Sequence, residues 1–335
     1  MPTSGSSRSA TGLRVVALGG GTGLAALLSG LKRRVGAEIA DLAGIVAVTD
    51  DGGSSGRLRR DFGLLPPGDI RNCLVALADD EDLLARLFQF RFEGGEGLSG
   101  HSFGNLFLAA LTEITGDFPQ AILTAEKILS VRGRILPATL ADLALRATTV
   151  GGRVVEGESA IGRAGEPLAR VELVPEAPPA WPPALAALER ADLVLLGPGS
   201  LYTSVLPNLL LPQIRAALAA SRAPVALVLN LMTQPGETDG LDAVAHLDAL
   251  EAHVGPGVID TLLVHDRAIP ENRLAPYRAE GAVPVAVDER ALTARGVRIE
   301  RADLLAPRGL VRHDPDRLAA AALALAARRA LAGAC

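Results

Sequence analysis

Short apolar runs recur along the chain, and each ends in glycine or in polar residues. Their Val, Leu, Ile and Ala residues are consecutive rather than alternating, so a strand formed by such a run must bury both of its faces. Longer segments with helical spacing lie between the runs, which is typical of a sheet covered by helices on both sides. We therefore predict an α/β fold, with a Rossmann-like, doubly wound and mainly parallel sheet. The expected strands are "LRVVALGGG", "LAGIVAVTDD", "ADLVLLGPGS", "APVALVLNLM", "VIDTLLVH" and "AVPVAVD".

The expected helices have clear apolar stripes, and the last one also has a clear start. Asp314 is predicted as its N-cap, Pro315 as its first residue, and Asp316 as an acid of its first turn. The other expected helices are "LAALLSGLKRR", "IRNCLVALADDEDLLARLFQF", "FGNLFLAALTEI" and "FPQAILTAEKIL".

The chain is predicted to form a single α/β domain over residues 13–335. Residues 131–183 interrupt the alternation, because they contain short glycine-punctuated runs followed by a proline-rich stretch. We interpret this range as a small β-rich, antiparallel insertion between two halves of one sheet. Residues 1–12 are small and polar, without the apolar region of a secretory signal, and we expect a disordered tail.

Composition excludes several classes of protein. The net charge of −5 argues against a nucleic-acid binder that relies on bulk electrostatics. No uninterrupted apolar run approaches the ~20 residues that a membrane helix needs. The two cysteines, Cys73 and Cys335, form no metal or disulfide pattern and suit a reducing compartment. We expect a soluble, cytoplasmic protein without membrane insertion or nucleic-acid binding.

Two glycine-rich loops follow expected strands and open helices. The first contains Gly20, Gly21, Thr22 and Gly23, and the second contains Gly199 and Ser200. Glycine lets backbone N–H groups approach an anion, and a helix N-terminus carries about half a positive charge. Each loop alone is equally explained as a tight strand–helix turn. Two such loops in one sheet can flank the crevice at a topological switch point, where open α/β sheets bind ligands.

Polar residues follow other expected strands and helix starts. Asp50 and Asp51 end the second strand, where doubly wound folds keep an acid that binds ribose hydroxyls. The alternative is a helix cap or a salt bridge with a nearby arginine (Arg57, Arg59 or Arg60). Asp69 is predicted as an N-cap, with Arg71 and Asn72 facing away from the apolar stripe of their helix. The remaining polar candidates are His101, Ser102, Asn105, Asn230, Thr233 and Gln234.

Seven motifs, in this order, closely resemble those of the gluconeogenesis factor family, in the 2-phospho-L-lactate transferase-like (CofD-like) superfamily. The resemblance implies a Rossmann-like fold and a bound nucleotide sugar of the UDP-N-acetylglucosamine type or a related nucleotide. It also implies a role in cell shape and wall synthesis during growth on gluconeogenic carbon sources. The motifs are GGGTG, VTDDGGSSGRLR, LPPGDIRN, GHSFGNL, GPGSLYTSVLPNL, NLMTQPGETDG and LVRHDP.

The resemblance also assigns roles to residues. It implies that the two glycine loops hold the diphosphate and that Asp50 and Asp51 meet hydroxyls or the base. Tyr277 and Arg312 lie where a tyrosine and an arginine contact the nucleotide in such proteins; the alternatives are a partly buried surface ring and a salt bridge to Asp314. The candidate site comprises Gly20, Gly21, Thr22, Gly23, Asp50, Asp51, Asp69, Asn72, Asn105, Gly199, Ser200, Asn230, Thr233, Gln234, Tyr277 and Arg312.

Two functions remain open from the sequence. One is a regulatory protein that binds a nucleotide sugar without catalysis, and the other is a transferase that uses a nucleotide diphosphate donor and a deazaflavin acceptor. The segment "GGSSGRLRRDFGLLPPGDIRN" favours the first. We assign no catalytic residue, metal site or required cofactor, although the acids are of the type that holds Mg²⁺. The protein partner in regulation or wall synthesis, and whether the chain forms a homodimer, are left open.

Overall fold

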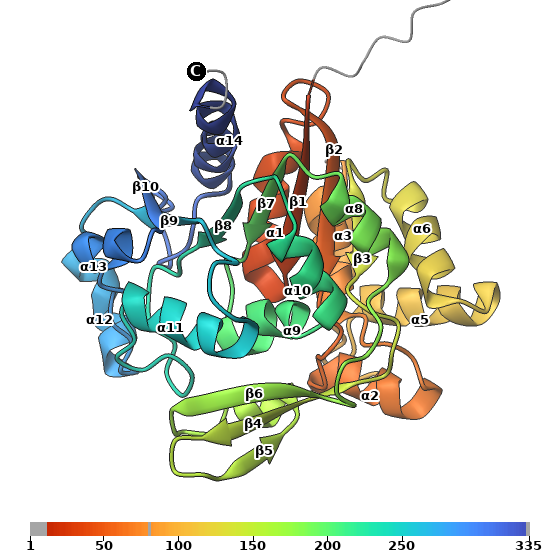
Figure 1. The fold of residues 1–335 in the computed structure, drawn as a ribbon. Coiled ribbons are helices and arrows are strands. Elements are labelled where there is room, and N and C mark those ends of the chain that lie inside the picture. The colour runs from red at the N-terminus through yellow and green to blue at the C-terminus, as the bar shows by residue number, and fades with distance from the viewer. Residues whose placement is uncertain (1–11, 80–81, 333–335) are drawn as a thin grey trace, which may run out of the picture.

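A seven-stranded parallel sheet forms the centre of the computed structural model, which describes residues 12–79 and 82–332. The order of the strands reverses at β1, since β2 and β3 extend the sheet on one side and β7 to β10 on the other (Figure 1). The predicted fold is confirmed. In spatial order the strands are β10 (Arg298–Ala302), β9 (Thr261–His265), β8 (Val225–Val228), β7 (Leu193–Leu196), β1 (Leu13–Gly19), β2 (Ile39–Val46) and β3 (Arg134–Pro137).

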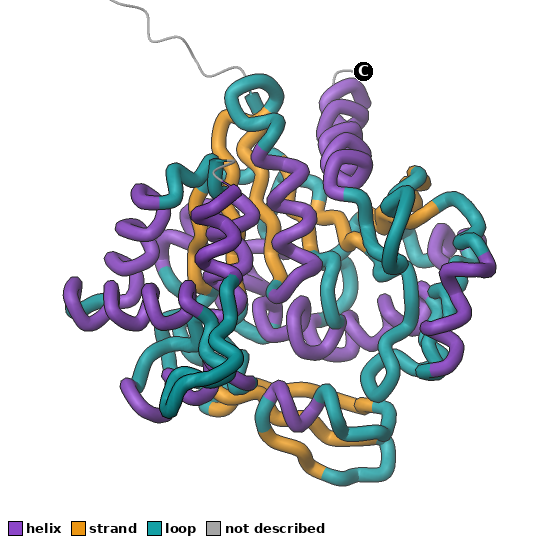
Figure 2. The backbone as a smooth tube through the Cα atoms, turned by 180° about the vertical axis from the view of Figure 1, so that it is seen from behind, coloured by secondary structure: helices purple, strands orange, loops and turns teal. Residues whose placement is uncertain are grey.

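Helices cover one face of this sheet and bury alternate residues of its strands. Val15 and Ala17 of β1 point into the core on this side, and Figure 2 shows the molecule from the side opposite to Figure 1. The helices of this side are α1 (Gly21–Lys32), α2 (Gly53–Phe62), α3 (Gly68–Leu77), α4 (Asp82–Gln89), α5 (Phe103–Thr115), α6 (Phe118–Ile128) and α14 (Pro315–Ala332).

The opposite face buries the other residues of the same strands. Val16 and Leu18 of β1 point into this second core, so the consecutive apolar residues of the run serve both faces. The helices on this side are α8 (Pro182–Glu189), the π-helix η1 (Leu201–Val205), α9 (Leu206–Leu209), α10 (Pro212–Ala219), α11 (Ala243–Val254) and α13 (Glu289–Ala294). Helix α12 (Glu271–Ala279) instead packs Leu274 into a separate small cluster with Leu231 and Met232.

A separate three-stranded antiparallel sheet lies beyond the ends of the parallel strands (Figure 1). It packs its apolar side, including Leu145 and Val171, into the second core. Strand β3, which falls within the range 131–183, belongs to the large sheet, and the small sheet begins at Ala144. Its elements are β4 (Ala144–Thr149), β5 (Val154–Glu156), α7 (Glu158–Ile161) and β6 (Leu168–Val174).

Three local expectations differ from the structure. The segment expected as one helix over 70–90 forms two, α3 and α4. The segment "AVPVAVD" forms no strand and pairs only through a bridge between Met232 and Pro284, because proline has no N–H to donate to a ladder. The edge position belongs instead to β10, whose polar, half-exposed sequence lacks the apolar signature of a central strand.

The expected tail, residues 1–12, lies outside the described residues except for Gly12, and so does Cys335. Among the described helices, none combines the length and apolar character that a membrane crossing requires. Cys73 is a buried free thiol in the layer of α1 and α3.

Replacing Gly30 of α1 by alanine tests the packing of α1 against α14. A Cβ on Gly30 would overlap the carbonyl oxygen of Pro315. We expect Gly30→Ala to lower the free energy of unfolding by about 1–3 kcal/mol through overpacking, although alanine is the better helix former by about 1 kcal/mol. Urea denaturation measures the change. The control is Ser29→Ala on the same helix, and a Gly30→Ala protein more stable than wild type would contradict the packing.

Candidate functional site

The strongest candidate site lies where the strand order reverses, between β1 and β7. A cavity of about 450 Å³ opens there at the carboxyl ends of the strands. Open α/β sheets bind ligands at such a switch point, and the volume is in the range of small-molecule sites. The cavity is lined by Gly20, Gly21, Thr22, Gly23, Ala26, Pro198, Gly199, Ser200, Thr203, Ser204, Asn230, Leu231, Met232, Thr233, Gln234, Val311, Arg312 and His313.

The two glycine loops both line this cavity, and they contact each other. A Cβ on Gly23 would overlap the carbonyl oxygen of Pro198 and would lie 3.2 Å from the Cα of Gly199. Asn230, after β8, ties the second loop down, since its Nδ2 donates to the Gly199 carbonyl at 2.8 Å. Its Oδ1 accepts the Gly199 N–H at 3.3 Å. The Gly21 N–H at the start of α1 is engaged by Asp69, and the other N–H groups of the first turn lie beside the second loop, which Asn230 holds in place.

The second loop is also held by an acid that the sequence analysis missed. The hydroxyl of Ser200 donates to the carboxylate of Glu237, and the amide Nε2 of Gln234 donates to the same carboxylate at 3.2 Å. Ser200 also caps η1, because its Oγ accepts the Thr203 N–H at 3.2 Å. Glu237 stands within the motif "NLMTQPGETDG", but nothing in its spacing marks it as a partner of Ser200.

Arg312 reaches the cavity from the C-terminal segment, far in sequence from both loops. Its side chain is exposed and lines the cavity, and no hydrogen bond or ion pair holds its guanidinium within residues 12–79 and 82–332. The alternative, a salt bridge between Arg312 and Asp314, is also absent from the described residues. Asp314 instead caps α14, as predicted, by accepting the N–H groups of Asp316 and Arg317 at 3.1 and 2.9 Å.

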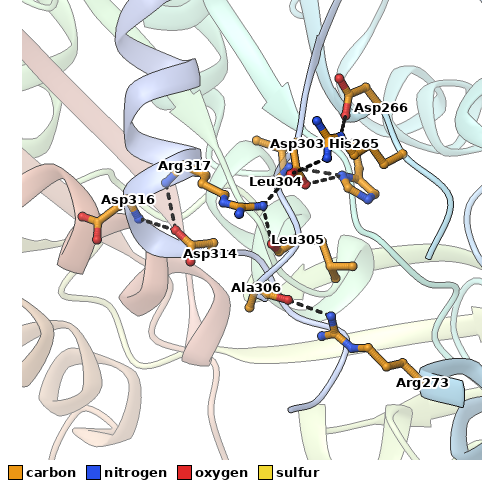
Figure 3. Close-up of polar contacts among 11 residues, drawn as sticks. His265, Asp266, Arg273, Asp303, Leu304, Leu305, Ala306, Asp314, Asp316 and Arg317 are labelled. Atoms are coloured by element: carbon orange, nitrogen blue, oxygen red, sulfur yellow. Dashed lines mark hydrogen bonds and ion pairs between the residues drawn. The ribbon is translucent and has the colours of Figure 1, made fainter. Parts of the chain in front are cut away.

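A network of polar contacts fixes the segment that carries Arg312 (Figure 3). Arg317 donates to Asp303 at 2.6 Å, and the N–H of Leu304 donates to His265 Nδ1 at 3.1 Å. Arg273 of α12 donates to the Ala306 carbonyl at 2.7 Å. Since the segment is tied to β9, α12 and α14, the Arg312 backbone has a fixed place beside the loops.

Tyr277 lies behind this segment and does not line the cavity. Its hydroxyl accepts the Val311 N–H at 2.9 Å, and its ring packs against the cluster that contains Leu231, Met232 and Leu305. In this structure Tyr277 therefore positions the residue before Arg312.

Four carboxylates gather beside the first glycine loop, just outside the cavity. A Cβ on Gly20 would lie 2.5 Å from Asp69 Oδ2, and the Gly21 N–H donates to the Asp69 carboxylate. Asp50 and Asp51 accept the N–H groups of Gly52 and Ser159 at 2.9 and 2.8 Å. The fourth acid is Glu158 of α7.

Crowding of these acids raises two of their pKa values. Burial and the charge of Asp50 raise the pKa of Asp69 to about 6, against an ordinary value of 3.8. Burial and the charge of Asp69 raise the pKa of Glu158 well above its usual range, while a hydrogen bond from Thr49 opposes the shift. An all-oxygen set of this kind has the chemistry that Mg²⁺ prefers, but three of the acids already accept backbone N–H groups. The sequence missed Glu158 because it comes from the insertion.

Asp69 is not the N-cap of α3, contrary to the prediction. Pro67 occupies that position and Asp69 lies in the first turn, where its carboxylate turns to the glycine loop. Arg71 was expected to face away from the apolar stripe but is buried at 9% exposure, and it donates to Asn72 Oδ1 and Ser102 Oγ at 2.6 Å.

Neither Asn72 nor Asn105 lines the cavity. Asn105 is buried under α2, where its Nδ2 donates to Ser55 Oγ at 3.3 Å. His101 pairs through Nδ1 with Ser54 Oγ at 3.0 Å, next to the same helix. These side chains form a polar layer between α2, α3 and α5.

The arginines that follow Asp50 and Asp51 in the sequence interact with other groups than these two acids. Arg57 donates to the Ser99 carbonyl at 2.8 Å, and Arg59 forms an ion pair with Asp142 at 2.5 Å. The alternative of salt bridges to Asp50 and Asp51 is therefore wrong for these two arginines. A further group of metal-ligand type, His265, Asp266 and Asp303, lies near β9, but Arg317 and the Leu304 N–H already engage two of its members.

Comparison with known proteins agrees with the fold and the motifs. Residues 15–305 match the family described as 2-phospho-L-lactate transferase CofD. This chain belongs to the CofD family. Within the family, it is 48% identical to the gluconeogenesis factor of Halalkalibacterium halodurans over 92% of this chain and 95% of that protein. It is 46% identical to the gluconeogenesis factor of Bacillus subtilis over 91% and 96%. The resemblance to the gluconeogenesis factor family is confirmed.

A solved CofD-family relative has the same fold. The crystal structure of a UPF0052 family protein from Bacillus halodurans superimposes with a TM-score of 0.88 at 47% identity, covering 92% of this chain and 98% of that one.

The substitution Asp69→Asn tests whether the pKa of Asp69 is raised in its group of acids. Because the folded-state pKa of Asp69 is raised, the native state binds more protons than the unfolded state between pH 3.8 and about 6. Stability is therefore lost as the pH rises through this window, by on the order of 2 kcal/mol. We expect Asp69→Asn to raise the free energy of unfolding at pH 8 and to have little effect near pH 4. Urea denaturation across this range measures the difference, and an equal effect at both ends would show that Asp69 is not crowded.

Proposed function

We propose that the chain is a non-catalytic protein that binds a nucleotide sugar of the UDP-N-acetylglucosamine type in the cavity between the glycine loops. One observation carries the proposal: two strand–helix turns of opposite halves of the sheet converge on a single cavity. Each turn offers backbone N–H groups at a helix start, and a diphosphate needs donors on both sides. The relatives named gluconeogenesis factor support the assignment to this branch of the family.

The charges around the cavity support a diphosphate as the anchoring group. Arg312 is the one lysine or arginine among the residues that line the cavity, and within residues 12–79 and 82–332 no hydrogen bond or ion pair holds its guanidinium, which can bind phosphate as a planar fork. His313 beside it is neutral at pH 7, since burial lowers its pKa to about 4. Asn230, Thr233 and Gln234 supply neutral polar groups for a sugar or a base.

We further propose that binding serves regulation, in the cytoplasm, of cell shape and wall synthesis during gluconeogenic growth. A transferase is the second candidate, and the acids beside Gly20 favour it, because carboxylates at a diphosphate could hold Mg²⁺. Glu158 accepts a hydrogen bond from Thr49, and Asp51 accepts the Ser159 N–H, so both acids also connect α7 to the segment after β2.

Incubation with UDP-N-acetylglucosamine tests both candidates in one experiment. We expect the ligand to raise the melting temperature, because binding to the native state alone stabilises by ~2.7 kcal/mol at a hundredfold excess over Kd. We also expect the ligand to be recovered unchanged after incubation with Mg²⁺ and a deazaflavin acceptor.

Two outcomes would contradict this expectation. A melting temperature that stays constant with this ligand but rises with another nucleotide would exclude the nucleotide sugar. Formation of a phospho-deazaflavin product would establish the transferase instead.

Arg312→Ala tests the contact between the C-terminal segment and the ligand. We expect a loss of roughly 1.5–3 kcal/mol of binding free energy, the range for a hydrogen bond to a charged group. Stability should change little, because no ion pair holds this guanidinium in the described part of the chain. Titration calorimetry and thermal melts measure the two effects. Arg308→Ala, on the same segment but absent from the cavity lining, is the control, and unchanged affinity in Arg312→Ala would remove this residue from the site.

A further inference from the structure

Glu237 is a buried acid behind the cavity without a cationic partner. It follows β8 and is 2% exposed. No lysine or arginine of the described ranges forms an ion pair with it, and its polar neighbours are hydroxyls and one amide. An uncompensated carboxylate is costly to bury, and this one lies beside a site that we propose for an anion.

The side-chain hydroxyl of Ser200 already uses its donor and both of its acceptor positions. Its hydroxyl donates to Glu237 Oε2, and its Oγ accepts from the N–H and the hydroxyl of Thr203 at 3.2 and 2.8 Å. One donor of Gln234 is also turned to Glu237. Two side chains that line the cavity therefore direct donors at an acid and not at a ligand.

The protonation state of Glu237 decides where the Ser200 proton points. The ionised carboxylate accepts that proton and adds a negative charge next to the cavity. A protonated Glu237 can donate its own O–H to Ser200 Oγ when the Thr203 hydroxyl turns from Ser200 to the Glu237 carboxyl, with which it also interacts. The Ser200 hydroxyl is then free to donate into the cavity. Protonation thus removes a repulsive charge and adds a donor for a phosphate oxygen.

We propose that Glu237 is a positioning residue that couples binding of the anionic ligand to uptake of one proton. The proton comes from solvent and stays on the Glu237 carboxyl while the ligand is bound. This inference rests on the proposed function, because it needs an anion in the cavity. Burial raises the pKa of Glu237 against the opposing hydrogen bonds of Ser200 and Thr203, which brings its titration closer to neutral pH.

The other titratable groups around the site are few. Tyr202 of η1 is near Glu237, but its hydroxyl donates to the Leu168 carbonyl and burial raises its pKa above 10. His313 stays neutral with a pKa of about 4. Asp69, with a pKa of about 6, titrates in the same range from the far side of Gly20 and must be separated by experiment.

Titration calorimetry with UDP-N-acetylglucosamine, from about pH 5.5 to about pH 8, tests the coupling. The pyrophosphate diester of this ligand does not titrate in that range, so any proton uptake belongs to the protein. In wild type, we expect proton uptake when buffers of different ionisation enthalpy are compared. The apparent Kd should rise by up to about tenfold per pH unit above the pKa of Glu237.

Glu237→Gln is the decisive variant. The glutamine amide can donate to Ser200 Oγ as the protonated acid would, so we expect tight binding at pH 8 and loss of the Glu237 share of proton uptake. Asp69→Asn is the matched control, and it should keep the part of the proton uptake that Glu237→Gln removes. Ser200→Ala should weaken binding near pH 5.5 and have little effect at pH 8.

Three outcomes would overturn the inference. Wild-type affinity that is independent of pH, without proton uptake, excludes it even if Glu237→Gln fails to fold. A Glu237→Gln protein with the wild-type pH dependence excludes it while leaving the proposed function intact. Failure of wild type to bind the nucleotide sugar at any pH removes the proposed function, and the inference with it.

Discussion

Close contact between the turn after β1 and the turn after β7 is the constraint on which the site depends. Gly23 must lack a side chain because the Pro198 carbonyl occupies the space where a Cβ would lie. Once the two turns touch, the N-terminus of α1 and the loop at Gly199 share one cavity, and Asn230 locks the second turn with two hydrogen bonds. A larger residue at this contact would separate the walls of the cavity.

The C-terminal segment completes the cavity through contacts that are themselves remote from it. Tyr277 holds Val311, Arg273 holds the Ala306 carbonyl, and Asp314 starts α14. These contacts leave Arg312 beside the cavity with no ion pair to any residue that the structure describes. The segment therefore supplies the cation that the loops lack, while its rigidity comes from α12, β9 and α14.

Acids on two sides of the cavity set its electrostatic character. Asp69 lies behind Gly20 and Glu237 lies behind Ser200, and burial raises the pKa of both. If the cavity binds an anion, as we propose, it should bind better when these carboxylates are protonated, and ligand affinity should then depend on pH. The same acids hold the turns in place, so their charges and their hydrogen bonds act together.

The sequence by itself determined the elements whose signals are local. Consecutive apolar residues in β1, the glycine-rich segment at 20–23 and the cap at Asp314 act within a few positions of themselves, and each was predicted correctly as strand, turn or helix start. Edge strand β10 was missed because an edge needs no apolar run. Only the tertiary structure decided that Asp69 turns to Gly20 and not to its own helix, that Tyr277 positions Val311, and that Glu158 and Glu237 join the site. These outcomes depend on which polar groups meet across the sheet and on which hydrogen bonds are already made. Neither is fixed by spacing along the chain, because strand order and loop packing bring together residues that are 34 positions apart for Tyr277 and Val311 and 109 apart for Glu158 and Thr49.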